Sequence, residues 1–278
     1  MTDGSEFLVR FWGVRGSIAC PGPETARYGG NTACVEMRCG SHVLTFDGGT
    51  GLRPHGKALA AEGPLDGDLF LTHTHFDHII GIPFFAPAFD AKSRFRVWAG
   101  HLMPHGSNVC DVLRLMMRSP LFPVPVEIFK AQIDYCDFGA GETLTPRPGI
   151  TVRTAPLDHP DGATGYRVEF GGRSACYVTD TNHVPGKPNA EILDLIRGAD
   201  IVIYDATFTD AEHERYAGWG HSTWQEGVRL CNAAGVGKLV TFHHDPERTD
   251  EALDALAAEM EAMRPGSLVA REGMVLKL

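Results

Sequence analysis

The sequence His-Thr-His-Phe-Asp-His at residues 73–78 constrains this chain more than any other feature. It directly follows the apolar run Asp68–Thr72, which predicts a buried strand. Residues two apart on an extended segment face the same side, so the side chains of His73 and His75 are expected to converge. If the chain turns into a helix at Phe76, the side chains of Asp77 and His78 would lie next to those of His73 and His75. These four side chains can then serve two ions, and zinc prefers imidazole and carboxylate ligands of this kind.

Strands outnumber helices in the rest of the sequence. Apolar or alternating runs predict strands at Phe7–Val14, Cys34–Cys39, Val43–Phe46, Ile150–Leu157, Gly165–Phe170, Ser174–Thr179, Ile201–Tyr204, Lys238–Phe242 and Ser267–Leu276. Helical patterns end near Ala61, cover Val109–Arg118, Asn189–Arg197 and Asp250–Met263, and run from a capping box at Ser222 to about Ala234. Two sheets packed face to face fit this order better than a doubly wound parallel sheet. We therefore predict an α+β fold, an αββα sandwich of two mixed β-sheets with outer helices.

No long linker, internal repeat or charge block divides the sequence, so residues 1–278 are predicted to form one domain. Three prolines in Ser119–Pro125 exclude a regular element there. We interpret the region of about residues 101–138 as a cover over one edge of the site. His101 and His105 fall in this region, where a surface position is the default expectation.

The net charge of −10 limits the partners that we expect. A non-specific nucleic-acid binder is normally basic, so the acidity argues against a long nucleic acid but not against a small phosphate ester held by metal ions. No apolar run is long enough for a membrane span, and the acidic segment Met1–Glu6 does not resemble a signal peptide. The seven cysteines contain no CxxC pair, which is typical of reduced thiols. These features predict a cytoplasmic protein without a membrane partner.

The HxHxDH motif at a strand end resembles the metallo-β-lactamase superfamily. The order of the later motifs resembles the branch that contains ribonuclease Z and the cyclic phosphodiesterases of phosphonate breakdown. This resemblance extends from about Phe7 to Pro246 and weakens in the middle of the chain. It implies two divalent metal ions, with zinc as the first expectation and manganese or iron as alternatives, and it implies a homodimer.

The resemblance also implies a ligand set, taken residue by residue. The first metal would be held by His73, His75 and His159, and the second by Asp77, His78 and one more histidine. Asp180 ends a strand and resembles the bridging carboxylate, which a two-metal site needs to hold the ions about 3.5–4 Å apart. His243 matches the family's strand–His–x–x–Pro pattern, and His244 stays open as the alternative. Asp47 matches an aspartate that usually lies outside the ligand set, or it simply caps a turn.

Gly220-His221-Ser222-Thr223 resembles the ribonuclease Z element that supplies a general acid. His221 precedes a predicted helix N-cap, where we expect the helix dipole to lower the imidazole pKa and the loop to leave the side chain mobile. Asp205 ends a buried strand at the position where that branch usually has a glutamate paired with the acid histidine. The alternatives are an ordinary residue before a helix for His221 and a strand-end cap for Asp205.

Together these residues predict a dinuclear metal-dependent hydrolase, most simply a phosphodiesterase. A hydroxide that bridges the metals would attack phosphorus, His221 would protonate the leaving group, and Asp205 would orient His221. We predict that Asp77, like His221 and Asp205, is a catalytic residue. We find no Gly/Pro- and Lys-rich arm of the ribonuclease Z kind, which favours a small cyclic or nucleotide-like diester over tRNA. Arg15 and Asn31 would either contact phosphate or cap loops.

Three other functions stay open at this point. A hydrolase of thioesters, lactones or β-lactams would use the same ligands without needing His221 and Asp205. Redox relatives with two iron ions often replace a histidine ligand by an acidic residue or carry a flavin domain, and the sequence shows neither. A metal-binding accessory protein without turnover would be favoured by a degenerate ligand set, whereas every ligand position here is filled.

Overall fold

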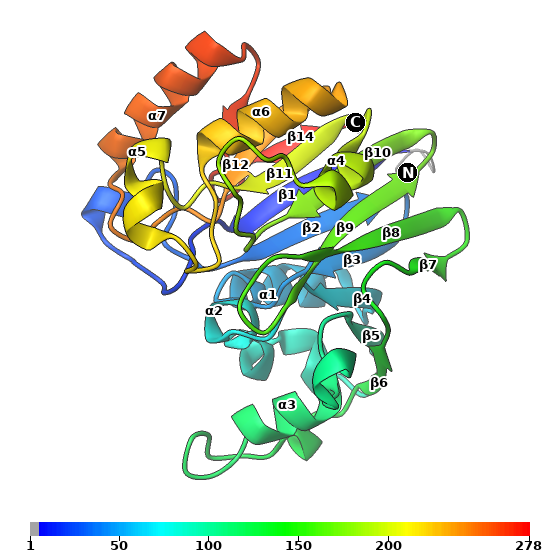
Figure 1. The fold of residues 1–278 in the computed structure, drawn as a ribbon. Coiled ribbons are helices and arrows are strands. Elements are labelled where there is room, and N and C mark those ends of the chain that lie inside the picture. Colours follow the sequence, from blue (N-terminus) through cyan, green and yellow to red (C-terminus); the bar gives the residue numbers. More distant parts are fainter. Residues whose placement is uncertain (1–5) are drawn as a thin grey trace.

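Two seven-stranded β-sheets form the centre of the computed structural model, which describes residues 6–278 (Figure 1). The earlier expectation about the N-terminal segment therefore falls largely outside the described residues. The first sheet has the order β14 (Val275–Lys277), β1 (Phe7–Gly13), β2 (Cys34–Cys39), β3 (His42–Phe46), β4 (Asp66–Leu71), β5 (Arg94–Ala99) and β6 (Gln132–Asp137). The second has the order β13 (Leu268–Val269), β12 (Lys238–Phe242), β11 (Ile201–Asp205), β10 (Arg173–Val178), β9 (Ala163–Phe170), β8 (Ile150–Leu157) and β7 (Thr143–Arg147).

The helices lie on the outer faces of the two sheets, as Figure 1 shows. The first sheet is covered by α1 (Leu52–Glu62) and α3 (Val109–Met116), and the short helix α2 (Phe76–Ile79) follows the end of β4. The second is covered by α4 (Ala190–Ile196), α6 (Trp224–Ala234) and α7 (Asp250–Met263), and α5 (Asp210–His213) packs against α6. This arrangement confirms the predicted αββα sandwich. Within residues 6–278, none of the helices is long and apolar enough to cross a membrane.

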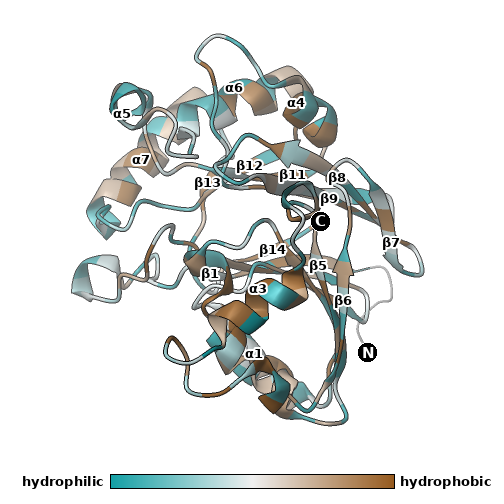
Figure 2. Cartoon of the chain, turned by 60° about the horizontal axis from the view of Figure 1, so that its bottom comes forward, coloured by the Kyte–Doolittle hydropathy of each residue, from teal (hydrophilic) through white to brown (hydrophobic). Residues whose placement is uncertain are grey.

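The main core lies between the two sheets. The ring of Phe46 stacks on Phe70 at a centroid distance of 5.2 Å, and both rings meet Tyr166 of the opposite sheet edge-on. Strand β1 alternates buried and partly buried residues because one of its faces points into this core. Figure 2 shows hydrophobic residues in the strands of both sheets and in the helices outside them, and the buried ones include residues from strands of both sheets. Burial of each such large side chain contributes about 1.5–3 kcal/mol to folding.

The structure corrects the sequence-based elements in three places. Residues 267–276 form two short strands in different sheets, β13 and β14, because the chain crosses from one sheet to the other at Arg271–Gly273. Strands β5, β6 and β7 were not predicted from the sequence. Helix α6 begins one residue later than predicted, since the Thr223 hydroxyl accepts the N-cap hydrogen bond from the Glu226 amide.

The middle region of residues 101–138 mostly extends the layer of the first sheet. Helix α3 buries Val109, Leu113 and Met116 against β5 and β6, and β6 is the edge strand of that sheet. Residues 119–125 form no regular element, in agreement with their prolines. His101 is 5% exposed, so the default surface expectation is wrong for this residue, whereas His105 is exposed as expected.

One edge of the sandwich collects the carboxyl ends of several parallel strands. Strands β3 to β6 run parallel to one another, and so do β10 to β13. Residues that follow β3, β4, β10 and β12 are therefore brought to the same end of the molecule. The polar residues singled out in the sequence lie at these strand ends.

Candidate metal centre

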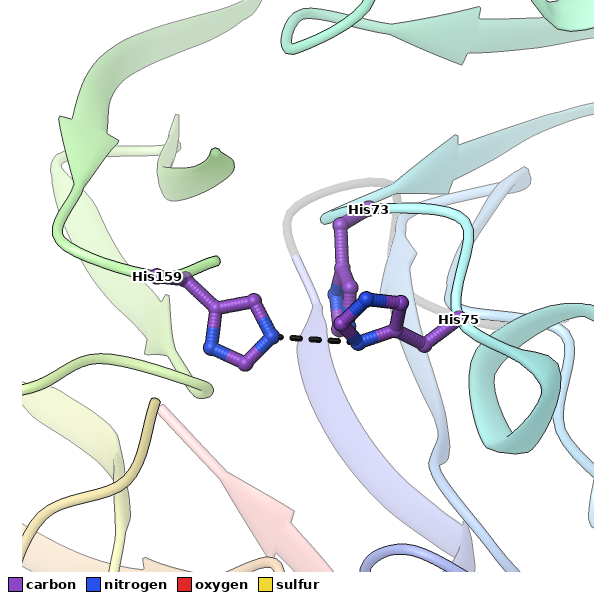
Figure 3. Close-up of side chains that lie close together, drawn as sticks. All are labelled: His73, His75 and His159. Atoms are coloured by element: carbon purple, nitrogen blue, oxygen red, sulfur yellow. Dashed lines mark hydrogen bonds between the residues drawn. The ribbon is translucent and has the colours of Figure 1, made fainter. Parts of the chain in front are cut away.

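Three histidines form a first group of donors where β4 and β8 end. His73 and His75 lie in the loop after β4, and His159 follows β8. One ring nitrogen from each residue lies within 4.8 Å of the others. Figure 3 shows the three rings converging from two separate loops, with His159 Nε2 at 3.1 Å from His75 Nδ1. The structure thus brings together the three residues that the resemblance assigned to one metal.

Hydrogen bonds to the rest of the chain orient two of these rings. His159 Nδ1 lies 2.8 Å from the carbonyl oxygen of Gly220. Nδ1 is therefore the protonated ring nitrogen and donates a hydrogen bond to that carbonyl. His159 Nε2 is then left with a lone pair that faces the other histidines. His73 Nδ1 contacts the Thr72 hydroxyl at 3.1 Å, while its Nε2 atom is buried without a hydrogen-bond partner. Buried polar atoms normally have a hydrogen-bond partner. A buried imidazole nitrogen without a partner in the protein is therefore available to bind a metal ion.

A second group of four donors adjoins the first. It contains Asp77 and His78 from α2, Asp180 after β10 and His243 after β12, with one donor atom of each within 4.8 Å of the others. His78 Nε2 and His243 Nε2 face each other at 3.2 Å. Asp77 Oδ2 lies 3.2 Å from His243 Nε2 and 3.3 Å from His78 Nε2. This set of two imidazoles and two carboxylates suits a divalent cation.

Asp180 lies between the two groups. Its Oδ2 atom is 3.3 Å from His78 Nε2, and its Oδ1 atom is 3.3 Å from His243 Nε2 and 3.9 Å from His73 Nε2. Burial disfavours the charged carboxylate, but His243, His78 and His73 together hold the pKa of Asp180 well below its usual value. One carboxylate thus reaches both donor groups, which is the arrangement required of a bridging ligand.

Asp47 lies outside the second group and orients one of its members, His78. Its carboxylate accepts hydrogen bonds from the Thr72 amide at 2.8 Å and from the Tyr177 hydroxyl at 2.9 Å. It also lies 2.9 Å from His78 Nδ1, which fixes the orientation of that ring and leaves Nε2 directed at Asp180. Asp47 therefore supports His78, a candidate ligand, and does more than cap a turn.

His221 and Asp205 form a pair beside this cluster. His221 Nδ1 lies 3.2 Å from Asp205 Oδ2, and Asp205 also accepts hydrogen bonds from the Thr207 amide and hydroxyl. Burial of the His221 ring opposes its charge, but the carboxylates of Asp205, Asp180 and Asp77 outweigh burial and raise its pKa to about 9.

The expected behaviour of His221 was wrong on two counts. The pKa is raised because three nearby carboxylates act at shorter range than the helix dipole, and α6 begins three residues later. The side chain is 12% exposed and packs against His243, so it is held in place rather than mobile.

Other candidate residues lie outside the donor groups. His244 points away from the site, and its Nε2 atom lies 2.9 Å from the Ala270 carbonyl. Arg15 is fully buried and donates to the backbone carbonyls of Gly29, Asp245 and Arg248, while Asn31 bonds the Glu272 carboxylate. Arg15 and Asn31 therefore hold loops together in this structure.

Sequence reasoning missed several residues that shape the site. The Thr207 hydroxyl contacts His243 Nδ1 at 3.1 Å, and the buried His101 bonds Thr74 within the His73–His75 loop. Trp219 lines a cavity of about 390 Å³ over the metal centre, together with Phe76 and His221. Trp219 directly precedes the Gly220–Thr223 element that the sequence had already indicated, and its position between Gly218 and Gly220 was a local signal for a residue exposed at the site.

Backbone strain is concentrated around the site. Among residues 6–278, the non-glycine residues with positive φ are Ser17, Asp47, Asp161, Asp180 and His243, with φ between 57° and 63°. Asp180 and His243 belong to the donor groups, Asp47 supports one, and the Ser17 amide donates to Asp77. Such conformations cost free energy and persist where the surroundings hold them, which is common at functional sites.

Substitution of Gly220 by alanine should disrupt the first donor group. A Cβ atom at this position would lie 2.2 Å from His159 Nδ1, and the backbone has φ +92°. Gly218→Ala is a matched control, because Gly218 has φ +83° but no atom within 4 Å of a Cβ. Both variants should lose about 1–2 kcal/mol of stability from the left-handed backbone. Metal analysis should show loss of metal only in Gly220→Ala, and equal metal contents would contradict this geometry.

Comparison with known proteins places these residues in a wider group. Residues 43–244 match the family described as the Beta-lactamase superfamily domain. Ribonuclease Z of Haloarcula marismortui is 24% identical to this chain over 93% of its length and 94% of the relative's length.

Solved structures share the fold at low sequence identity. The metallo-beta-lactamase fold protein YhfI of Bacillus subtilis gives a TM-score of 0.73 at 18% identity, covering 99% of this chain and 100% of YhfI. A diphosphatase from the PhnP family gives a TM-score of 0.72 at 19% identity, covering 98% of this chain and 97% of that one.

Proposed function

Because this chain belongs to the β-lactamase superfamily, we propose that it is a dinuclear metal-dependent hydrolase that cleaves a small phosphodiester. The observation that carries this proposal is the His221–Asp205 pair, with Nδ1 and Oδ2 3.2 Å apart directly beside the donor groups. A thioester or lactone hydrolase would have no need for this pair. The ribonuclease Z relative supports phosphodiester chemistry by its name.

Seven residues would hold the two cations. His73, His75 and His159 would bind one, Asp77, His78 and His243 would bind the other, and Asp180 would bridge them. Nitrogen and carboxylate donors favour zinc, and manganese and iron accept the same ligands. When bound, two such cations neutralise charge on phosphoryl oxygens and make water a better nucleophile.

His221 is suited to supply a proton to the leaving group. Its Nδ1 proton is directed to Asp205, so the second ring nitrogen, Nε2, can hold the proton that a leaving alkoxide takes. In the metal-free protein the pKa of the ring is about 9, and the carboxylate that raises it most is Asp205, which lies outside the proposed ligand set. This geometry supports the proposed roles of His221 as the acid and of Asp205 as its positioning partner.

The proposed substrate is small rather than a long RNA. The cavity of about 390 Å³ is at the lower end of the range for small-molecule sites. A net charge of −10 disfavours a long polyanion, although the relative's name indicates an RNA substrate for that protein. The cytoplasmic location and the homodimer stay predictions.

The test is to load the purified protein with zinc or manganese, confirm about two metals per chain, and assay bis(p-nitrophenyl) phosphate. Thioesters and lactones would be assayed beside it, with metal-free protein as the control. Cleavage of the diester that depends on the metal supports the proposal. If the metal-loaded protein cleaves the thioester or the lactone but leaves the diester intact, the phosphodiesterase proposal is wrong and the protein is a carbonyl hydrolase.

A further inference from the structure

Two exposed aromatic residues border the cavity over the metal centre. Phe76 is 67% exposed and Trp219 is 64% exposed, and both line the same cavity as His75, Asp77 and His221. A single exposed aromatic residue on a protein surface needs no explanation. Two of them at the mouth of a cavity that also holds the candidate catalytic groups indicate a binding surface for an apolar, flat group.

Trp219 is held in place by a series of aromatic contacts. Its ring packs edge-on against Tyr216 at 5.2 Å, and Tyr216 stacks on Phe208 at 4.5 Å with an interplanar angle of 5°. Phe208 is 4% exposed and packs edge-on against His221 at 5.9 Å. Tyr216 and the buried Phe208 thus hold the indole of Trp219 in position while most of its surface stays accessible. A ligand that stacks on the indole would therefore not need to order this side chain.

Phe76 is positioned by its neighbours in the sequence. It lies between His75 and Asp77, each of which belongs to a donor group, and its carbonyl accepts the Ile80 amide in α2 at 2.8 Å. The backbone at Phe76 is therefore held by helix α2 between two residues of the donor groups, while the ring remains on the surface. Both aromatic residues are thereby tied to the groups expected to act on phosphorus.

We propose that Phe76 and Trp219 form an aromatic subsite that binds the base of a nucleotide diester whose phosphate lies at the metal centre. This inference rests on the proposed phosphodiesterase function and narrows its substrate class. Nucleobases stack on aromatic side chains with little dependence on sequence, whereas a cyclic phosphoribosyl compound without a base has no aromatic face to stack. The subsite therefore favours cyclic nucleotides and dinucleotides over diesters that lack a base.

The experiment compares the binding of AMP and ribose 5-phosphate to the metal-loaded protein by calorimetry. The two ligands share the phosphate and ribose and differ by the base. The wild-type protein should bind AMP at least about tenfold more tightly. Trp219→Ala should weaken AMP binding by about tenfold and leave ribose 5-phosphate binding unchanged, and Phe76→Ala should act in the same direction. Trp219→Phe should retain most of the affinity for AMP because it keeps an aromatic face.

Phe84→Ala is the matched control, since Phe84 is 54% exposed but does not line this cavity. It should bind both ligands as the wild type does. Equal affinities of the wild-type protein for AMP and ribose 5-phosphate would overturn the inference, as would an equal loss of both in Trp219→Ala. Because binding needs no turnover, base-dependent binding without diester cleavage would keep the subsite and reject the phosphodiesterase.

Discussion

Replacement of His221 by alanine is expected to slow cleavage of a diester with an alkoxide leaving group by about 10²–10⁴-fold. The reason is that an alkoxide leaves slowly unless a proton reaches it, and His221, paired with Asp205 at 3.2 Å, is the group placed to supply that proton. His221 lies outside the proposed ligand set, so the metal content should stay at about two ions per chain. Steady-state kinetics and metal analysis of the same preparations measure both quantities.

The leaving group separates an acid role from a structural one. A p-nitrophenolate leaves without much help from a proton, so the loss in His221→Ala should be smaller for bis(p-nitrophenyl) phosphate than for an alkyl diester. Asp205→Asn should show the same dependence, because Asp205 acts through His221. His105→Ala, at an exposed histidine of the neighbouring cavity, should behave as the wild type. An equal loss for both leaving groups, or loss of metal, would remove His221 from the acid role.

The ligand set implied by the family resemblance could be assigned residue by residue because each proposed ligand lies in a local sequence pattern. The residues from His73 to His78 are close in the chain, and Asp180 and His243 directly follow predicted buried strands. Since the carboxyl ends of β4, β10 and β12 lie at one edge of the sandwich, these patterns also bring the side chains together in space. The predicted fold is confirmed because the alternating and apolar runs in the sequence correspond to most of the inner strands.

Features that depend on contacts distant in sequence could not be predicted. Gly220 lies 61 positions from His159, and only the folded chain shows that its carbonyl orients that ring. Likewise, the raised pKa of His221 comes mainly from Asp205 and Asp180, which oppose burial, and no local rule anticipates their distances. The two interpretations of Asp47 were separated only by its contact with His78, which lies 31 positions further along the chain.

The missed strands have a different cause. Strands β6 and β7 are edge strands whose residues are mostly exposed or half-buried, so their sequences lack a clear apolar face. The end of the chain was misread for the opposite reason: residues 267–276 are apolar enough for one strand, but the turn at Arg271–Gly273 divides them between two sheets. Strand β5 is the exception, because it is an inner strand with alternating buried residues that was nevertheless not predicted. Apart from β5, apolar patterning predicts the interior of this fold better than its edges.

Substitution of Asp180 by asparagine is expected to have the largest effect of any single change in the site. Among residues 6–278, Asp180 is the one carboxylate within 4 Å of all three of His73, His78 and His243, so both proposed cations would lose an anionic ligand when its charge is removed. Asparagine keeps the shape of the side chain and tolerates the φ of 57° at this position. We expect the metal content to fall from two ions to one or none, and diester cleavage to fall by at least about 10³-fold, since the cations supply several kcal/mol of transition-state stabilisation.

Asp161→Asn is the matched control for this substitution. Asp161 also has a positive φ, of 63°, and lies 3.9 Å from His75, but its side chain is 85% exposed. Loss of its charge is screened by water and should leave two ions bound, with activity changed by less than about fivefold. If Asp180→Asn kept both ions and its activity, the carboxylate would not bridge the two donor groups, and the site would have to work with one metal or with two that share no protein ligand. If both variants lost metal equally, the general negative field around the histidines, rather than the bridging position of Asp180, would account for cation binding.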